Sequence, residues 1–333
     1  MVAKISRRAA LPAFGLPLLG LGIPWAAGQS NAQAAWPARA VRIVVVYPPG
    51  GLSDGTARAM ADKMAARLGV PVLVENRAGA GGTIGMDFVA KAAPDGYTLA
   101  FSAISPLTLS PYLTKVNYDP QHDLAPVASV MYTPVLVVGT PAFSGKTFAD
   151  LLAEARARPG RIRWATSGSG TLGHLVLEHV RLTSNTEITH IPYKGGGQQL
   201  TDALAGHFEI LSTNVAALPL QYIRSGRFKP LAVGSPIRLA VLPNVPTLAE
   251  LGFQQANLTS IFGIFAPGRT SADIIQRLNL EINAVIGQTE FQGRLRSVNN
   301  VPAGGSAAEF ARQIVAEARN NARILHVSNL RPE

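Results

Sequence analysis

The sequence predicts an α/β protein of two lobes, each built on a doubly wound sheet, with two crossing strands joining the lobes and a ligand cleft between them. Three observations support this prediction. Apolar, β-branched runs alternate with amphipathic stretches, which is the pattern of sheets covered by helices. Glycine-rich loops repeatedly separate a predicted strand from the helix that follows it. The chain has 333 residues, enough for two domains, yet no low-complexity linker divides it.

The composition excludes several classes of protein. Hydrophobic residues make up 47% of the chain and charged residues only 15%, so general disorder is excluded. The chain has no cysteine, which rules out a disulfide framework, a thiol nucleophile, zinc–thiolate sites and iron–sulfur clusters. Its stability must therefore come from packing.

The first half of the chain predicts four strands. An apolar run over 41–47 ends in Pro48-Pro49-Gly50-Gly51, and residues 54–68 then show helical periodicity. A short strand is predicted at 70–75, and the glycine-rich turn at 79–85 leads into a helix that ends near residue 93. The remaining strands of this half are predicted at 97–102 and, as an unusually long extended run, at 127–139.

The second half continues the same alternation. Thr147 and Asp150 have the spacing of a capping box, which predicts a helix that ends near Pro159. Two later helices are predicted from about residues 272 and 307, each with a Ser/Thr-x-x-acid start. Those starts are Thr270 to Asp273 and Ser306 to Glu309. Strands are predicted at 161–166, 188–193, 209–213, 230–234 and 261–266.

The lobe boundaries follow from the long strand. We expect the strand at 127–139 to cross from the first lobe to the second, and the stretch near 260–266 to cross back. The C-terminal helices would then complete the first lobe. The predicted division is residues 35–132 with 259–333 for lobe 1, and residues 133–258 for lobe 2.

Residues 1–34 have the pattern of an export signal. Ser6, Arg7 and Arg8 form a cationic start, an apolar stretch follows, and Ala32-Gln33-Ala34 fits the small-x-small rule for cleavage after Ala34. A membrane anchor is the alternative, but prolines and glycines interrupt the apolar stretch. The sequence therefore predicts a periplasmic protein. The Ser-Arg-Arg start resembles a twin-arginine signal, and the ordinary Sec route stays open.

The net charge indicates the kind of partner. Removal of this segment takes away Lys4, Arg7 and Arg8 and no acid, so the formal charge falls by three from +10 to +7. The remaining chain has no basic run and no nucleic-acid motif. We therefore expect small anionic ligands and no nucleic-acid partner.

Two glycine motifs resemble nucleotide-binding patterns. Gly168-Ser169-Gly170-Thr171-Leu172-Gly173 is a formal G-x-G-x-x-G, but no acidic residue ends the next strand, as a dinucleotide site requires. Ser144-Gly145-Lys146-Thr147 lacks the upstream glycine of a phosphate loop, and Thr147 is better explained as a helix N-cap. The first motif is better explained as a turn that places a helix N-terminus.

Two other loops predict ligand contacts. Tyr193-Lys194-Gly195-Gly196-Gly197 could bring backbone close to an anion, and the alternative is a solvated turn. In Pro48 to Asp54, Ser53 could cap the following helix while the free N–H groups of its first turn face outward. If the loop from Ser167 to Thr171 does the same in the other lobe, two helix N-termini meet across one cleft. A carboxylate fits such a site.

These motifs resemble the substrate-binding receptors of tripartite tricarboxylate transporters, the Bug-type periplasmic proteins. The resemblance runs along nearly the whole chain after residue 35. It is carried by Trp36-Pro37, Tyr47 to Asp54, Glu75 to Gly82, Ala93 to Leu99, Thr166 to Thr171 with His174, His190 to Gly195, and Leu242 to Thr247. The fold that it implies is the two-lobed, type II-like periplasmic-binding-protein fold.

The resemblance also implies site residues. In similar proteins, backbone amides, hydroxyls and ordered waters hold the ligand carboxylates. The residues that this nominates are Leu52, Ser53, Asp54, Ser102, Ser105, Ser167, Gly168, Gly170, Thr171 and His174, and Tyr193 is expected to line the cleft. Thr213-Asn214 stands where the family commonly has Asp-Asn or Asp-Ser, and Leu52 is bulkier than usual, so we expect an atypical ligand.

Several nominees have a purely structural alternative. Asp54 could serve only its helix N-terminus. Ser53, Ser167 and Thr171 could be caps without ligand contact, and His174 could be a helix-start histidine that only other protein groups bind.

The implied function is that of an extracytoplasmic receptor. It would capture a small carboxylate, such as a di- or tricarboxylate, an acidic amino acid or an aromatic acid, and deliver it to membrane permease subunits. A ligand sensor for a two-component signalling partner is one alternative, and an exported NAD-dependent oxidoreductase or hydrolase is another. No G-x-S-x-G or H-E-x-x-H occurs, so we expect a non-enzymatic protein without a metal site. We also expect no cofactor and a monomer.

Overall fold

The protein was analysed as a computed structural model that describes residues 36–327. The predicted export signal over residues 1–34 lies outside the described residues. The strands are β1 (Val41–Val45), β2 (Val72–Asn76), β3 (Thr98–Ala103), β4 (Leu124–Gly139), β5 (Arg163–Thr166), β6 (Thr189–Pro192), β7 (Ile210–Asn214), β8 (Lys229–Gly234), β9 (Thr259–Pro267) and β10 (Val301–Pro302). The helices are α1 (Leu52–Leu68), α2 (Thr83–Ala90), α3 (Ser105–Thr108), α4 (Ser110–Leu113), α5 (Phe148–Ala157), α6 (Leu172–Ser184), α7 (Gly196–Leu204), α8 (Ala217–Arg224), α9 (Ala272–Ile286), α10 (Thr289–Arg296) and α11 (Ala307–Val327). Two 3-10 turns, η1 (Ala80–Gly82) and η2 (Gln254–Ala256), complete the set.

The first sheet has the strand order β2-β1-β3-β9-β4, with β10 paired to β4. β1 runs parallel to β2 and β3, whereas β9 is antiparallel to β3 and β4. Successive side chains of a strand point to opposite faces, so Ile43 and Val45 join one buried cluster and Val44 joins another. Both faces of this sheet are therefore buried, which explains the uninterrupted apolar run of β1.

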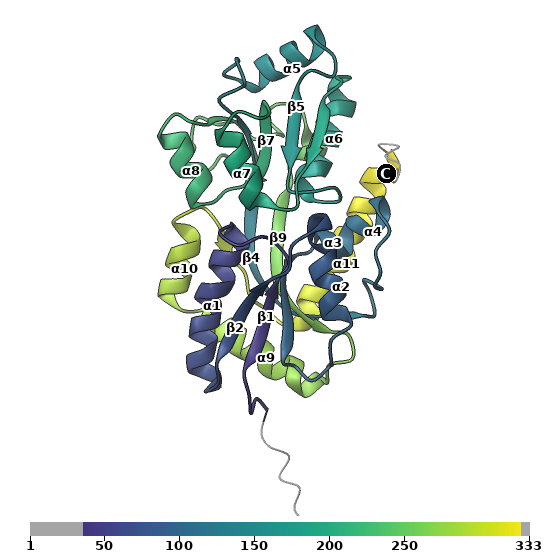
Figure 1. Cartoon of the computed structure of the whole chain (residues 1–333), viewed down its shortest axis with the longest axis vertical. Coiled ribbons are helices and arrows are strands. Elements are labelled where there is room, and N and C mark those ends of the chain that lie inside the picture. The colour runs from purple at the N-terminus through teal and green to yellow at the C-terminus, as the bar shows by residue number, and fades with distance from the viewer. Residues whose placement is uncertain (1–35, 328–333) are drawn as a thin grey trace, which may run out of the picture. The chain divides into compact units, whose positions relative to one another are not determined.

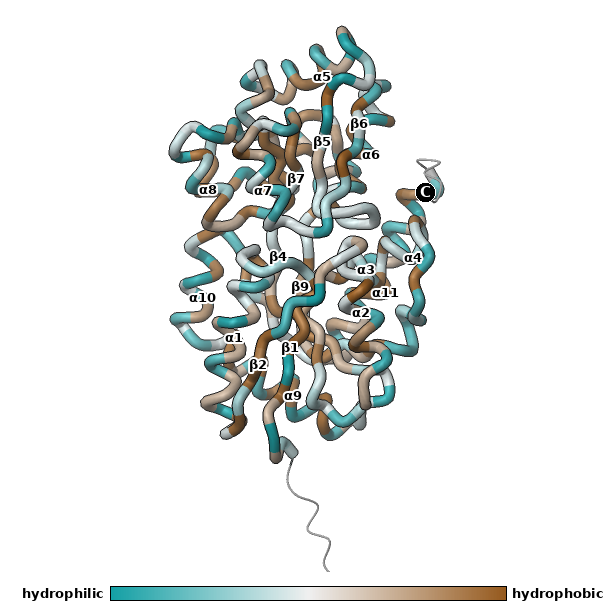
Figure 2. Tube along the Cα trace, viewed as in Figure 1, coloured by the Kyte–Doolittle hydropathy of each residue, from teal (hydrophilic) through white to brown (hydrophobic). Residues whose placement is uncertain are grey.

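Helices cover the two faces of the first sheet. Met60 of α1 and Leu278 of α9 pack on the face that carries Ile43. Met86 of α2 and Phe310 of α11 pack on the opposite face, and Figure 1 shows α1 and α2 on different sides of the sheet. Along these helices hydrophilic and hydrophobic residues alternate, as expected of helices with one buried face (Figure 2).

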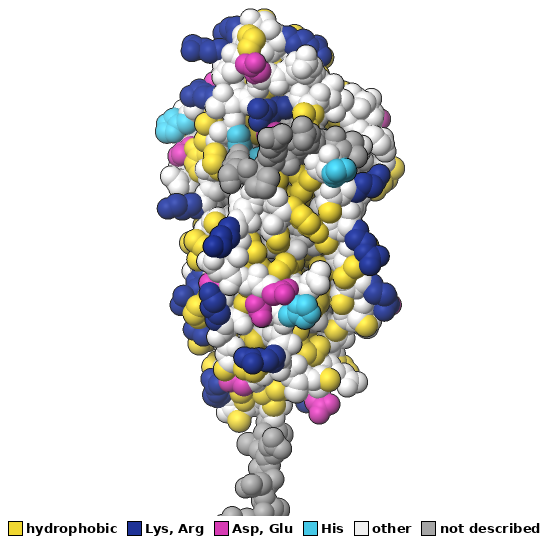
Figure 3. All heavy atoms as spheres, turned by 90° about the vertical axis from the view of Figure 1, so that its right-hand side faces the viewer, with side chains coloured by type: hydrophobic (Ala, Val, Ile, Leu, Met, Phe, Trp, Pro, Cys, Tyr) yellow, Lys and Arg dark blue, Asp and Glu magenta, His cyan; other side chains and the backbone are white. Residues whose placement is uncertain are grey.

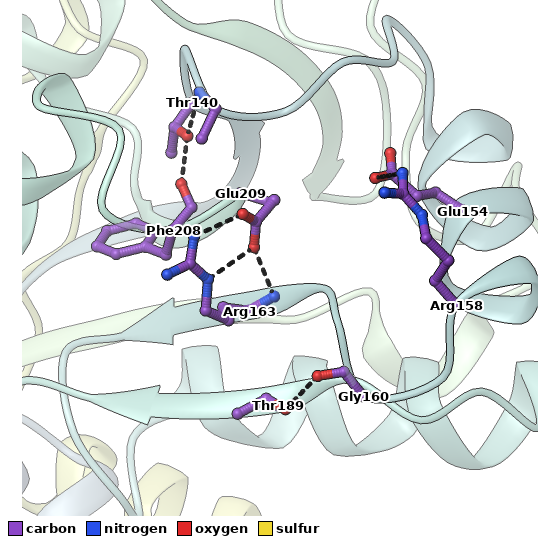
Figure 4. Close-up of polar contacts among 9 residues, drawn as sticks. Thr140, Glu154, Arg158, Gly160, Arg163, Thr189, Phe208 and Glu209 are labelled. Atoms are coloured by element: carbon purple, nitrogen blue, oxygen red, sulfur yellow. Dashed lines mark hydrogen bonds and ion pairs between the residues drawn. The ribbon is translucent and has the colours of Figure 1, made fainter.

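The second sheet has the order β8-β4-β7-β5-β6. Val135 and Val137 face the cluster that contains α5 and α6, whereas Leu136 and Val138 face the cluster of α7 and α8. Arg163 binds Glu209 through Nη2 at 2.7 Å across this sheet, and Figure 4 shows its guanidinium turned toward that carboxylate. Burial raises the pKa of Glu209, but hydrogen bonds from Arg163 outweigh burial and hold the pKa below its usual value.

One strand belongs to both sheets. Residues Leu124 to Pro134 of β4 pair with β9 in the first sheet, and Val135 to Gly139 pair with β7 and β8 in the second. The return segment enters β9 beside this point, because Val135 N donates to Leu258 O at 3.4 Å. We refer below to the first sheet with its covering helices as the first lobe, and to the second sheet with α5 to α8 as the second lobe. The α/β fold class with two sheets is confirmed, and β4 crosses from one sheet to the other; β9, which returns the chain to the first lobe, pairs within the first sheet only.

The predicted elements are largely confirmed. All nine predicted strands are present, and the capping boxes of Thr147 with Asp150 and of Ser306 with Glu309 form as expected. One predicted cap is wrong by one residue: Ser271, and not Thr270, is the N-cap of α9 and accepts from Ile274 N. The short helices α3 and α4, α10 and the two-residue strand β10 were not predicted.

Candidate ligand-binding site

A cavity of about 360 Å³ lies where β4 passes between the sheets, and both lobes line it. The volume is within the range of small-molecule sites. The first lobe contributes the loop before α1 with the first turn of that helix, the end of β3, the start of β9, and the last turn of α10 with the stretch after it. The second lobe contributes the loop before α6, the end of β7 and the first turns of α7 and α8.

The loop after β1 places the N-terminus of α1 at this cavity. Gly50 has a φ of +79° and Gly51 is the N-cap, so α1 begins at Leu52. No side chain caps this helix, hence the expectation that Ser53 is the cap is wrong; Ser53 lies in the first turn and lines the cavity. The N–H groups of a first helical turn have no partner within the helix and are free to bind a ligand.

Asp54 holds this loop in place. Its Oδ2 accepts from Gly50 N at 3.0 Å and its Oδ1 accepts from Arg58 Nε at 3.0 Å. Burial raises the pKa of Asp54, but the hydrogen bonds from Arg58 and Gly50 lower it by more, so the net pKa is below its usual value. The carboxylate stays ionised and shapes the loop, and it does not line the cavity.

The loop after β5 places the N-terminus of α6 at the same cavity. Thr171 is the N-cap, but its hydroxyl donates to Gly168 O at 2.7 Å and accepts nothing from the helix. Leu172 and Gly173 of the first turn line the cavity together with Ser167 and Thr171. The expectation that two helix N-termini face one cleft is therefore met by α1 and α6.

Two further helices begin at this cavity. Gly196 at the start of α7 lines it, as do Ala217, Leu218 and Pro219 at the start of α8. Each helix N-terminus is equivalent to roughly half a positive charge, so four of them create a positive potential without side-chain charge. Among residues 36–327 the one charged side chain in the cavity wall is Arg294.

Seven of the thirteen residues nominated from the sequence line the cavity. These are Leu52, Ser53, Ser105, Ser167, Thr171, Thr213 and Asn214. The hydroxyl of Ser260, also in the wall, donates to Asn214 Oδ1 at 3.3 Å, which fixes the amide at the end of β7.

Six nominees lie outside the wall, namely Asp54, Ser102, Gly168, Gly170, His174 and Tyr193. Ser102 is fully buried and donates to Ala103 O at 2.7 Å. Tyr193 donates its hydroxyl proton to Asp202 Oδ2 at 2.7 Å, and burial is the main cause that raises its pKa to about 12.

Gly168 and Gly170 contact the other lobe. A Cβ on Gly168 would lie 3.0 Å from Gly81 N, and a Cβ on Gly170 would lie 2.7 Å from Ser110 Oγ. Ser110 also donates to Gly170 O at 3.0 Å. These glycines let the backbones of the two lobes approach each other, so this structure has the lobes closed around the cavity.

His174 does not line the cavity, but it stabilises the loop from Ser167 to Gly170. Its Nδ1 accepts from Gly170 N at 3.3 Å, and its ring stacks on that of His190 with centroids 4.3 Å apart. Nε2 of His190 lies 2.7 Å from Thr166 Oγ1, and that hydroxyl accepts from Gly168 N at 3.2 Å. The two histidines thereby hold both ends of the loop from Ser167 to Gly170.

The sequence interpretation missed the part of the wall that the last turn of α10 and the stretch after it form. Arg294, Leu295, Ser297, Val298 and Asn300 line the cavity although they lie more than 200 residues after the first loop. No motif marks this segment, and only its packing beside α1 brings it to the site, where Arg294 Nη2 lies 3.5 Å from Gly55 O. Tyr47 and Phe262 were also missed as wall residues, although Tyr47 belongs to a quoted motif.

Over the described range, no group of three or more His, Cys, Asp or Glu side chains could hold a metal ion. No helix within residues 36–327 is long and apolar enough to cross a membrane. On the face shown in Figure 3, Lys and Arg side chains are scattered with acidic side chains among them.

Comparisons with known proteins agree with this geometry. Residues 56–330 match the family described as "Tripartite tricarboxylate transporter family receptor". The protein BugT of Bordetella pertussis is 37% identical over 276 residues, which cover 81% of this chain and 84% of BugT. A Rhodopseudomonas palustris protein solved with adipate is 31% identical with a TM-score of 0.84, covering 90% of this chain and all of that one.

A second solved structure, MatC of Rhodopseudomonas palustris with bound malate, is 27% identical with a TM-score of 0.81, covering 86% of this chain and 99% of that one. The family is one of periplasmic solute-binding receptors and not of enzymes. The chain belongs to the tripartite tricarboxylate transporter receptor family.

Proposed function

We propose that this protein captures a small organic carboxylate in the cavity between its lobes and delivers it to the membrane subunits of a tripartite transporter. The observation that carries this proposal is the convergence of four helix N-termini on one cavity that both lobes line. Backbone N–H groups aimed at one cavity favour an anion of small size. The adipate and malate bound by the two Rhodopseudomonas proteins are ligands of this kind.

The proposed site comprises the thirteen nominated residues in two roles. Leu52, Ser53, Ser105, Ser167, Thr171, Thr213 and Asn214 would contact the ligand, because they line the cavity. Asp54, Ser102, Gly168, Gly170, His174 and Tyr193 would position those groups. We also propose that residues 35–132 with 259–333 move as one lobe, that residues 133–258 move as the other, and that the receptor acts as a monomer.

The test is a thermal-shift screen of the mature protein against mono-, di- and tricarboxylates, amino acids and aromatic acids. A true ligand at about 100 times its dissociation constant stabilises the native state by about 2.7 kcal/mol. Isothermal titration then gives the affinity of each hit. A screen in which no carboxylate raises the melting temperature would contradict the proposal, and formation of product from a hit would indicate an enzyme instead.

A variant of Thr171 tests the site itself. Thr171→Ala removes the hydroxyl that donates to Gly168 O at 2.7 Å, so the loop loses one hydrogen bond and the ligand one polar neighbour. One such bond is worth about 0.5–1.5 kcal/mol, and we expect the dissociation constant to rise about threefold to tenfold. Thr171→Ser keeps the hydroxyl and is the control. Equal affinities of both variants and wild type would remove Thr171 from the site.

The export step and the membrane partner need separate experiments. We propose that residues 1–34 direct export to the periplasm, by a twin-arginine or Sec route, and that the mature chain begins at Ala35. The intact mass of the exported protein would establish its first residue. Uptake of labelled ligand should require both the receptor and the permease subunits; uptake that persists without the permease would contradict delivery.

A further inference from the structure

The last turn of α11 lies in a buried apolar cluster that the two lobes share. One member of this cluster belongs to α6 in the second lobe, and the other four belong to the first lobe, two of them in α11. Each of the five side chains is at most 5% exposed. We call this set the interlobe cluster; its members are Leu109, Leu113, Leu175, Ile324 and Leu325.

The first lobe holds α11 in place before the helix reaches this cluster. Phe310 and Ile314, in its first half, pack in the apolar cluster on one face of the first sheet. Asn321 Nδ2 donates to Thr108 O at 3.1 Å. An α-helix rises about 1.5 Å per residue, so the 21 residues of α11 span about 30 Å. In Figure 1 the end of α11 stands at the height of the second lobe.

A hydrogen bond beside the interlobe cluster also joins the lobes. Ser110, which follows Leu109 in the chain, donates its hydroxyl proton to Gly170 O at 3.0 Å. Ser110 is fully buried, and a hydrogen bond shielded from water is stronger than an exposed one. The chain itself passes between the lobes only within β4 and at the start of β9. The contact of α11 with α6 is therefore non-covalent and can break when the lobes part.

Leu172 connects the interlobe cluster to the cavity. This first residue of α6 lines the cavity and also packs against the interlobe cluster. None of the described residues of α11 lines the cavity. Because both lobes form the wall, the cavity is complete only when the lobes are closed. An interaction that stabilises the closed form therefore also prepares the site for a ligand.

We propose that the interlobe cluster keeps the lobes closed in the free protein, before a ligand enters. Parting the lobes exposes Leu175 and Leu325 to water, which is unfavourable for apolar side chains. The closed form is thus the major state, and the open form that admits a ligand is the minor state. The apparent affinity for a ligand falls with the fraction of protein outside the binding form, so the cluster raises affinity for whichever ligand the cavity takes.

The test measures the distance between the lobes in protein refolded from urea, which removes any ligand carried through purification. The chain has no cysteine, so Ala93→Cys in the first lobe and Ala153→Cys in the second, both at exposed positions, accept one spin label each. We expect pulsed electron–electron resonance to give one narrow distance. Adding Ile324→Ala and Leu325→Ala removes most of two side chains from the interlobe cluster, and a second distance should become the major one.

Two further variants separate closure from overall stability. Ile314→Ala truncates a buried isoleucine of the same helix that packs within the first lobe only. It should lower the urea midpoint and leave the single distance unchanged. Ser110→Ala removes the hydrogen bond to Gly170 O without altering α11, and it should also produce the second distance.

Three results would overturn the proposal. The first is a single, unchanged distance in the folded double variant of α11, which would make the contact ordinary packing. The second is two distances in the labelled protein without further changes, because the cluster would then not hold the lobes closed. The third is the second distance in Ile314→Ala as well, which would show a general loss of stability. If the double variant does not fold, Ser110→Ala decides: a second distance supports the proposal and its absence contradicts it.

Discussion

Tyr47 illustrates how the surroundings of a side chain in the cavity wall set its protonation state. Its ring lines the wall, and burial raises the pKa of its hydroxyl to about 12, although hydrogen bonds with Ser102, the Ala103 backbone and Ser105 offset part of the effect. The phenol therefore stays protonated at any physiological pH and remains a donor. Ser102, which does not reach the cavity, acts here through Tyr47.

Two buried histidines, His190 and His179, give a prediction about pH. Burial, together with the neighbouring His174 and Arg181, lowers the pKa of His190 to about 3, and burial lowers that of His179 to about 4. Both rings are neutral in the folded protein but titrate near 6.5 when unfolded. Their stabilisation is thus complete above pH 6.5 and is lost as the pH falls toward 4 and then 3. We expect urea midpoints to decrease over this range.

His190→Gln removes one of these titrations while its amide can still reach Thr166 Oγ1. We expect a shallower fall of the unfolding free energy between pH 6.5 and 4, by at most about 1.4 kcal/mol for each pH unit. His122→Gln should make the fall of the unfolding free energy steeper, because hydrogen bonding to Asp119 raises the pKa of His122 and its protonation stabilises the folded protein. A wild-type pH profile in His190→Gln would contradict this account.

At the residue level, the sequence predicted side chains that line the cavity where a glycine loop precedes a helix, and their contact with a ligand stays a prediction. Ser53, Ser167 and Thr171 sit in glycine loops next to helix starts, so their position at the cavity follows from local structure. The prediction that Ser53 caps α1 is wrong, because Gly51 occupies the N-cap position. Arg294 and Asn300 could not be predicted as wall residues, since their place at the cavity depends on tertiary packing that no local pattern encodes.

At the scale of elements, capping decides where helices begin. Thr147 accepts from Asp150 N at 3.1 Å, and the Asp150 carboxylate accepts from Thr147 N at 2.9 Å. Thr147→Ala removes the side-chain cap of α5, and we expect the unfolding free energy to fall by about 1 kcal/mol. Urea denaturation measures this, and Thr147→Ser should be near wild type. Neither change should alter ligand affinity, because α5 does not line the cavity.

Helices and strands with a clear pattern of hydrophobic residues were predicted from the sequence, and the shortest elements were not. The strands of the sheets are continuous apolar runs between glycine or proline loops, which is why their positions could be predicted from the sequence. The four-residue helices α3 and α4 each begin with a serine followed by a proline and are too short to show a helical period. β10 has two residues and exists only because β4 offers it a partner, so its formation depends on the rest of the fold.

At the scale of the whole molecule, glycines govern how closely the lobes approach. A Cβ on Gly195 would lie 2.1 Å from Pro48 Cδ, and a Cβ on Gly197 would lie 3.3 Å from Pro49 O. Pro48 and Pro49 belong to the first lobe and the two glycines to the second. Small residues at these contacts are thus a requirement of the closed arrangement.

Gly197 allows this requirement to be tested without backbone strain, because it lies in α7 and its φ is outside the left-handed region. Gly197→Leu should hinder closure against Pro49 and raise the ligand dissociation constant at least tenfold, while the protein without ligand stays folded. Small-angle scattering with saturating ligand should show a more open form than wild type. Gln198→Leu, at the next and exposed position, is the control. Wild-type affinity in Gly197→Leu would show that closure tolerates a larger side chain.

Four helices begin at one cavity, so the attraction of an acid and the choice among acids can depend on different groups of the protein. In the proposed function, the capacity to hold an acid resides in peptide N–H groups, which every amino-acid exchange except one to proline leaves in place. Choice among acids would fall to replaceable side chains of the cavity wall such as Leu52 and Leu218. Descendants of such a scaffold can acquire new cargo through few genetic changes, without rebuilding the part that attracts the cargo.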